Sequence, residues 1–122
     1  MSLGMADRVW NRAALESGGA DPRQGDRALA ALLLAHGSLM NGGFDDALDS
    51  LSREELEAAI AGFRFFAMDH AADLVERASA GAFGSDLEEA NRQYYEAVPE
   101  DGEIQERFHS LFASKPNVFA PI

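Results

Sequence analysis

The stretch SREELEAAIAGFRFFAMDHAADLVERASA, residues 52–80, decides the fold. Its start matches a capping box, in which the side chains of Ser52 and Glu55 each accept a hydrogen bond from the other residue's backbone amide. Apolar positions then recur at three- and four-residue spacing, which is typical of one buried helical face. That stripe consists of Leu56, Ile60, Phe63, Ala67, His70, Leu74 and Ala78. The pattern predicts one long helix at about 53–80 that runs through the centre of the core.

Shorter amphipathic segments lie on both sides of this stretch, at about 6–17, 22–40, 44–51, 85–98 and 103–113. Each shows helical spacing of its apolar residues, and glycine or proline separates most of them. No strand pattern and no internal repeat stands out. The sequence therefore predicts an all-α fold, a single-domain bundle of five or six helices around the long central helix.

The length of 122 residues fits one domain that buries about two thirds of its unfolded surface. We interpret residues 1–3, MSL, as an expression-vector scar, and residues 4–122 as a single helical domain with an extended tail from about 114. The chain has no cysteine, so it has neither disulfides nor thiolate ligands. Without an export signal or an apolar span, a cytoplasmic location and no membrane contact are expected.

Acidity is the most informative bulk property, because 21 acids and 10 bases give a net charge of −11. Two blocks carry the excess: residues 45–57 hold six acids and one base, and residues 86–106 hold eight acids and one base. Such a surface repels nucleic acid and anionic lipid and attracts basic partners. Direct binding of DNA or RNA is therefore not expected.

A second stretch, NGGF at 41–44, separates a leucine-rich helical pattern from the first acidic block. Glycine loops can present backbone amides to a phosphate, but a P-loop also needs a strand and a lysine, and a dinucleotide fingerprint needs a strand and a third glycine. Asn41, Gly42, Gly43 and Phe44 are therefore interpreted as a structural motif. Gly42 would take the left-handed conformation that ends one helix, and Gly43 would let the next helix begin at an angle.

The residues that could carry metal or acid–base chemistry are few. Glu106 and His109 have the Glu-x-x-His spacing of di-iron bundles, but such a site needs a second copy and two further glutamates. His70 lies in the apolar stripe and is expected to be a core histidine held by a hydrogen bond. We therefore predict no catalytic residue, metal or cofactor. A small helical metal protein or enzyme using Glu106, His109 and His70 remains the alternative.

Three stretches in order resemble one family: NGGF at 41–44, LEAAIAGFRFFAMDHAADLVERA at 56–78 and LEEANRQYYEAVPEDGEIQERFHSLFASKP at 87–116. This order resembles the bacterial DNA-mimic-protein-like family, first known as a domain of unknown function. The resemblance runs from about Leu33 to Pro116. It implies an all-helical acidic protein without catalytic activity, and in the characterised member carboxylates stand in for DNA phosphates on a transcription factor's DNA-binding face.

The leading hypothesis is a non-enzymatic, cytoplasmic bacterial protein whose acidic blocks bind a basic protein, in particular a nucleic-acid-binding regulator. A protein whose acidity serves only solubility is a further alternative, and the oligomeric state stays open, a homodimer included. Mimicry requires carboxylates in rows on one face, which net charge alone does not establish. The carboxylates expected to meet the partner are Asp45, Asp46, Asp49, Glu54, Glu57, Asp86, Glu88, Glu89 and Glu96.

Overall fold

The computed structural model describes residues 4–122 and is all-helical over that range, as the sequence predicts. The residues interpreted as an expression scar lie outside the described part. Six α-helices and one 3₁₀ turn follow one another in the order α1 (Met5–Glu16), α2 (Gln24–Ser50), α3 (Arg53–Phe65), α4 (Asp69–Ser79), α5 (Leu87–Ala97), α6 (Asp101–Ser114) and η1 (Pro116–Val118).

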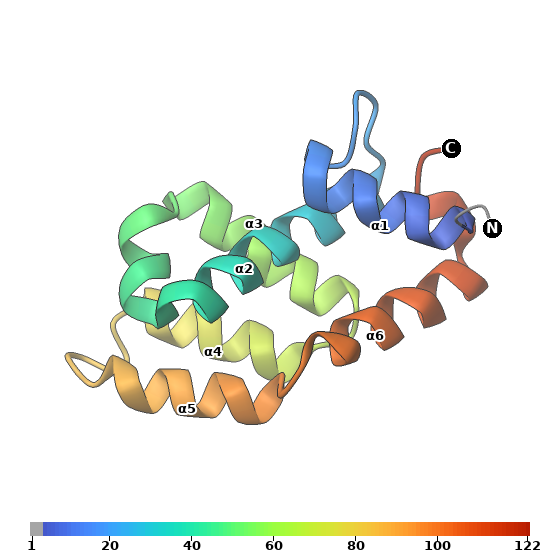
Figure 1. The fold of residues 1–122 in the computed structure, drawn as a ribbon. Coiled ribbons are helices and arrows are strands. Elements are labelled where there is room, and N and C mark those ends of the chain that lie inside the picture. The colour runs from blue at the N-terminus through green and yellow to red at the C-terminus, as the bar shows by residue number, and fades with distance from the viewer. Residues whose placement is uncertain (1–3) are drawn as a thin grey trace.

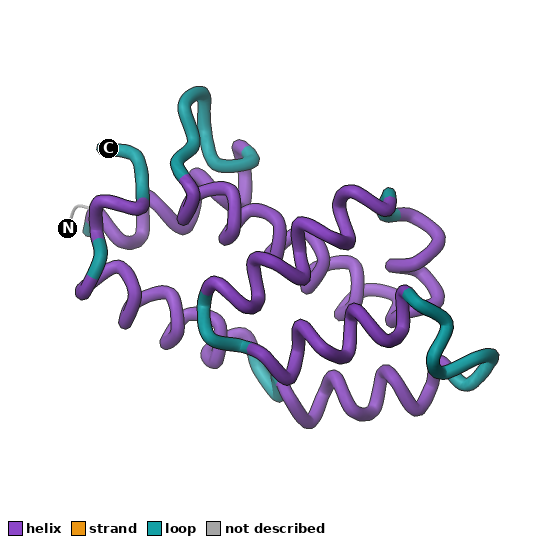
Figure 2. The backbone as a smooth tube through the Cα atoms, turned by 180° about the vertical axis from the view of Figure 1, so that it is seen from behind, coloured by secondary structure: helices purple, strands orange, loops and turns teal. Residues whose placement is uncertain are grey.

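The longest helix, α2, organises the bundle because it packs against α1, α3 and α5. The fourth helix, α4, packs against α3 and also contacts α5. From the end of α5, α6 leads away towards α1, so that the two ends of the described chain meet on one side of the molecule (Figure 1). The view from behind shows the same arrangement, with the connection between α4 and α5 at the opposite end (Figure 2).

The prediction of one long central helix at about 53–80 is wrong, because two helices, α3 and α4, occupy this stretch. Residues 66–68 connect α3 to α4, and Ala67 has a φ of 61°. Met68 donates its backbone N–H to the carbonyl of Phe63 at 2.8 Å, and Ala67 donates to Arg64 at 3.0 Å. This is the hydrogen-bond pattern of a Schellman motif, in which a left-handed residue ends a helix.

His70 is exposed on α4 and is not the core histidine that the single stripe predicted. The break at residues 66–68 resets the helical phase, so positions before and after it no longer share one face. The buried face of α4 is formed instead by Ala71, Ala72, Leu74, Val75 and Ala78.

The core contains two groups of aromatic side chains. In the first, the ring of Tyr94 meets those of Phe44 and Phe63 edge to face, with centroid distances of 6.1 and 6.3 Å. In the second, Phe108 packs against Trp10 and Phe119, with centroids 5.6 and 5.4 Å apart. The first group joins α2, α3 and α5, and the second joins α1 and α6 to the tail. Edge-to-face pairs of this kind add about 0.5–1.5 kcal/mol each to area burial.

A buried ion pair fastens the tail to the start of α2. Asp26 is fully buried, and its carboxylate accepts hydrogen bonds from Arg12 at 2.9 Å, from the Arg23 amide at 2.9 Å and from the Ala120 amide at 2.7 Å. The guanidinium of Arg12 also donates to the carbonyls of Ala120 and Pro121. The segment after Ser114 thus makes one 3₁₀ turn and is then held against α1 and the start of α2.

Candidate partner-binding surface

The Asn-Gly-Gly-Phe stretch bends α2 into two segments. Gly43 has φ 70° and ψ −168°, a backbone conformation that is essentially restricted to glycine. The expected corner is therefore present, but the left-handed glycine is Gly43 and not Gly42. After the bend, residues 44–50 form the second segment of α2, which carries Asp45, Asp46 and Asp49.

Asn91 of α5 closes this corner from the other side. Its side-chain oxygen accepts the backbone N–H of Phe44 at 2.7 Å, which satisfies a donor at the start of the second α2 segment. A Cβ on Gly43 would lie 2.7 Å from the Asn91 side-chain nitrogen. The corner thus holds α5 against α2, and the start of the second acidic block lies near the first block.

The first acidic block lies on the second α2 segment and the first turns of α3. Asp45, Asp49 and Glu54 are exposed. Asp46 is half-buried and faces Ser38, whose hydroxyl donates to its carboxylate at 3.4 Å. Glu57 is exposed and forms an ion pair with Arg53 at 3.2 Å.

The second acidic block begins at the N-terminus of α5. Asp86 is the N-cap residue and accepts the backbone N–H of Glu89 at 3.2 Å, while Glu88 is exposed. Arg92 forms ion pairs with Glu89 and Glu96. The hydrogen bonds from Arg92 lower the pKa of Glu89 to about 2. Glu89 is thus charged, and the ion pairs with Arg92 place an arginine of the same helix beside both Glu89 and Glu96.

Most of the expected carboxylates come from elements at one end of the bundle, where the second α2 segment, the start of α3 and the start of α5 lie together (Figure 1). We call this set the acidic end: Asp45, Asp46, Asp49, Glu54, Glu57, Asp86, Glu88 and Glu89. Glu96 lies seven residues beyond Glu89 on α5, about 10 Å further along the helix. It stands apart from the other carboxylates.

Some of these acids also have a structural role. Glu54 occupies the first turn of α3, and Glu88 and Glu89 occupy the first turn of α5. A carboxylate at a helix N-terminus interacts favourably with the helix dipole, typically by about 0.3–1 kcal/mol. Helix stabilisation accounts for these three positions and also applies to Asp45 in the first turn of the second α2 segment, but it does not account for Asp49, which lies near the C-terminus of that segment.

The residues of the metal-site alternative do not form a centre. Glu106 and His109 are exposed on α6, and His70 is exposed on α4. Residues 4–122 contain no cluster of three or more His, Cys, Asp or Glu side chains placed to hold a metal ion.

A hydrogen-bonded group that the sequence motifs do not indicate lies around the buried His36. Its Nδ1 is 2.8 Å from the hydroxyl of Tyr94, and its Nε2 is 2.7 Å from a carboxylate oxygen of Asp101. Burial, and then the negative charge of Asp101, raise the pKa of Tyr94. The group joins α2, α5 and the first turn of α6, so its evident role is to hold three helices together. A histidine on the apolar face of the predicted 22–40 helix was the available signal.

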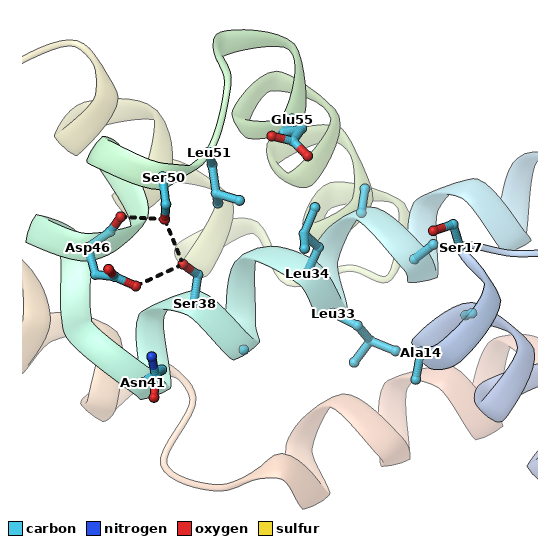
Figure 3. A pocket seen from close by; sticks show the side chains of 14 residues that line it. Ala14, Ser17, Leu33, Leu34, Ser38, Asn41, Asp46, Ser50, Leu51 and Glu55 are labelled. Atoms are coloured by element: carbon cyan, nitrogen blue, oxygen red, sulfur yellow. Dashed lines mark hydrogen bonds between the residues drawn. The ribbon is translucent and has the colours of Figure 1, made fainter.

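An open groove of about 930 Å³ lies along α2. Leu33, Leu34 and Leu51 line it, and Asp46 and Glu55 lie towards the α2–α3 junction (Figure 3). Ala14 and Ser17 of the α1 end lie at the other side of the same view. We call this feature the α2 groove.

Comparison with protein families gives a match over residues 22–118, which is well over half of the chain. The chain belongs to the DMP19-like protein family. This is the DNA-mimic-like family that the sequence resembles. The match begins just before α2 and ends in η1, so both acidic blocks and the Asn-Gly-Gly-Phe corner fall within it.

Membership of the DMP19-like family agrees with a non-catalytic protein of the DNA-mimic kind. Searches of curated proteins and of solved structures give no match for this chain. Within residues 4–122, no helix combines the length and the apolar character needed to cross a bilayer.

Proposed function

We propose that this protein is a non-enzymatic DNA mimic whose acidic end binds the basic, DNA-contacting face of a nucleic-acid-binding regulator. The observation that carries the proposal is that the first acidic block and the start of the second, far apart in sequence, lie on elements at one end of the bundle in a member of the DMP19-like family. The partner is a protein with clustered lysine and arginine, because such a face is built to meet phosphates.

The exposed carboxylates that have no ion pair among residues 4–122 are the strongest candidates for contact. Within the acidic end these are Asp45, Asp49, Glu54, Asp86 and Glu88. Asp86 also accepts a backbone N–H as the N-cap of α5, so it is left unchanged in the variant below. These carboxylates differ from Glu57 and Glu89, whose charges are already countered by arginines on their own helices. A basic partner would gain most from the former set, since it need not displace an existing ion pair.

A pull-down from a native lysate tests the proposal. The immobilised protein should capture a DNA-binding regulator at low salt, lose it steeply as salt rises, and release it to added duplex DNA, because protein and DNA would compete for one face. The end variant Asp45→Asn, Asp49→Asn, Glu54→Gln and Glu88→Gln should lose at least about tenfold in affinity, ~1.4 kcal/mol.

The matched control removes the same number of exposed charges elsewhere, by Asp7→Asn, Glu16→Gln, Asp21→Asn and Glu106→Gln. It should keep most of the binding. Equal binding by the two variants, or the absence of any salt-sensitive basic partner, would leave the acidity as a solubility feature and refute mimicry.

A further inference from the structure

The α2 groove adjoins the acidic end and shares only Asp46 with it. Its floor is the face of α2 from Ala30 to Asn41, which is about 17 Å long at 1.5 Å per residue. Gly37 lies in the middle of this face, and a Cβ added to it would meet nothing within 4 Å. Leu34 beside it is 49% exposed. The surface is thus apolar, open and low at its centre, with room for about three turns of another helix.

The charge of the groove is one-sided. Asp46 and Glu55 line it, together with apolar and small polar residues, and no lysine, arginine or histidine does. The hydrogen bond from Ser38 to Asp46 is 3.4 Å long, beyond the usual O–H···O range, so this half-buried carboxylate can accept a much stronger bond. A charge-assisted bond from a cation would be about twice as strong as a neutral one.

We propose that the α2 groove receives an amphipathic helix of the basic partner, with its apolar side chains on Leu33, Leu34 and Leu51 and a lysine or arginine on Asp46. Helix-in-groove docking of this kind uses apolar anchors at three- and four-residue spacing. The inference rests on the proposed function, because the partner there is basic. It adds a second contact surface, which selects one regulator among the many proteins that bind DNA.

Charge argues against a second copy of this chain as the occupant. A two-fold contact places the same face on both sides, and this face offers carboxylates without any base to pair with them. Each copy also carries a net charge of −11. A basic helix satisfies Asp46, and a second copy does not.

Synthetic peptides test the proposal directly. The probe is a helical peptide of about 14 residues, ~20 Å long, with a stripe of leucine and alanine and one arginine. Two versions are made, one with the arginine near the N-terminus and one with it near the C-terminus. A companion peptide replaces the arginine with glutamine. Binding is measured by fluorescence anisotropy against the wild type, Gly37→Leu, Asp46→Asn and two controls. Gly102→Leu adds the same side chain on α6, where a Cβ meets only the Glu100 side chain at 3.9 Å, and Asp45→Asn removes an exposed neighbouring charge outside the groove.

One arginine peptide should bind the wild type, and Gly37→Leu should weaken it at least about tenfold by filling the groove, while Gly102→Leu leaves it unchanged. Asp46→Asn should remove the advantage of arginine over glutamine, and Asp45→Asn should keep it. Equal binding to wild type and Gly37→Leu, no preference for arginine, or no peptide binding would overturn the proposal. So would wild-type self-association that Gly37→Leu abolishes, seen by sedimentation.

The two proposals can fail separately. If the groove is wrong but mimicry is right, the regulator captured from lysate still elutes with duplex DNA and binds Gly37→Leu as tightly as the wild type. If mimicry is wrong but the groove is right, the arginine peptide still discriminates Asp46→Asn from Asp45→Asn, and no captured protein competes with DNA.

Discussion

Gly43 is the residue on which the placement of the acidic blocks depends. Its backbone conformation bends α2, and the missing side chain lets Asn91 approach and accept the Phe44 amide. The backbone conformation of Gly43 and the close approach of Asn91 therefore each require glycine at this position.

Gly43→Ala should therefore destabilise the protein strongly. Backbone strain costs about 1–3 kcal/mol, and the new Cβ would displace Asn91 in addition. The free energy of unfolding from urea titration measures the loss. Gly37→Ala is the matched control: Gly37 is helical, exposed and has open space above it, so this change should stabilise by up to about 1 kcal/mol. Equal effects of the two changes would contradict the assigned role of the bend.

Glu89 should titrate far below an ordinary glutamate, because Arg92 holds its pKa at about 2. A depressed folded pKa means that the ion pair stabilises the protein above the ordinary glutamate pKa of about 4.3 and that this contribution disappears as pH falls towards 2. Arg92→Gln should return the pKa towards its ordinary range, as measured by NMR titration of the Glu89 carboxyl. Arg53→Gln, on α3, should leave it low. A wild-type Glu89 that already titrates in the ordinary range would exclude this ion pair in solution.

The sequence predicted the contacts of individual polar residues less well than it predicted the helices. Asn41 was assigned to the corner by its place in sequence, but the cap comes from Asn91, 47 positions from Phe44. The same is true of His36, whose partners lie on two later helices. His36 is a polar residue on the predicted apolar face of the 22–40 segment, which indicates a hydrogen-bond partner without identifying it. Periodicity shows which face of a helix is buried, but it does not show which residues of other helices that face contacts.

At the scale of elements, the capping box at Ser52 and Glu55 is confirmed, since each side chain accepts the other's amide. The sequence does not predict the end of α3 at Phe65, because the stretch FFAMDH at 65–70 contains neither glycine nor proline. Ala67 takes the left-handed position after the helix, which glycine usually occupies. The apolar residues of α3 and α4 happen to keep three- and four-residue spacing across the break, so they look like one stripe. Burial of Phe66 and Met68 in the core stabilises the break that local propensity does not.

Ala67→Gly should consequently raise stability. A left-handed conformation costs an L-residue about 1–2 kcal/mol, and the added flexibility of glycine in the unfolded chain removes about 0.5–1 kcal/mol of that gain. A net increase of up to about 1 kcal/mol is expected in chemical denaturation. Ala58→Gly, at an exposed position inside α3, should lose about 1 kcal/mol. If Ala67→Gly destabilised as much as Ala58→Gly, α3 and α4 would be continuous in solution.

At the scale of the molecule, the ion pair between Arg12 and Asp26 joins α1, α2 and the tail into one unit. Asp26→Asn should cost about 3–5 kcal/mol, because it leaves the arginine largely buried without its countercharge. A fall in melting temperature by calorimetry measures it. Asp21→Asn, at an exposed position in the connection between α1 and α2, should have little effect. A similar loss from both would show that Asp26 is not a special anchor.

The same anchor imposes an order on synthesis. Arg12 and the Ala120 carbonyl it binds are 108 positions apart, a distance that a ribosome covers in roughly 5 to 20 s at about 5–20 residues per second. During that time α2, α3 and α4 can already pack, while the guanidinium lacks the carbonyls that complete its coordination. Helix α1, which is synthesised before the other described helices, therefore completes its hydrogen bonds last.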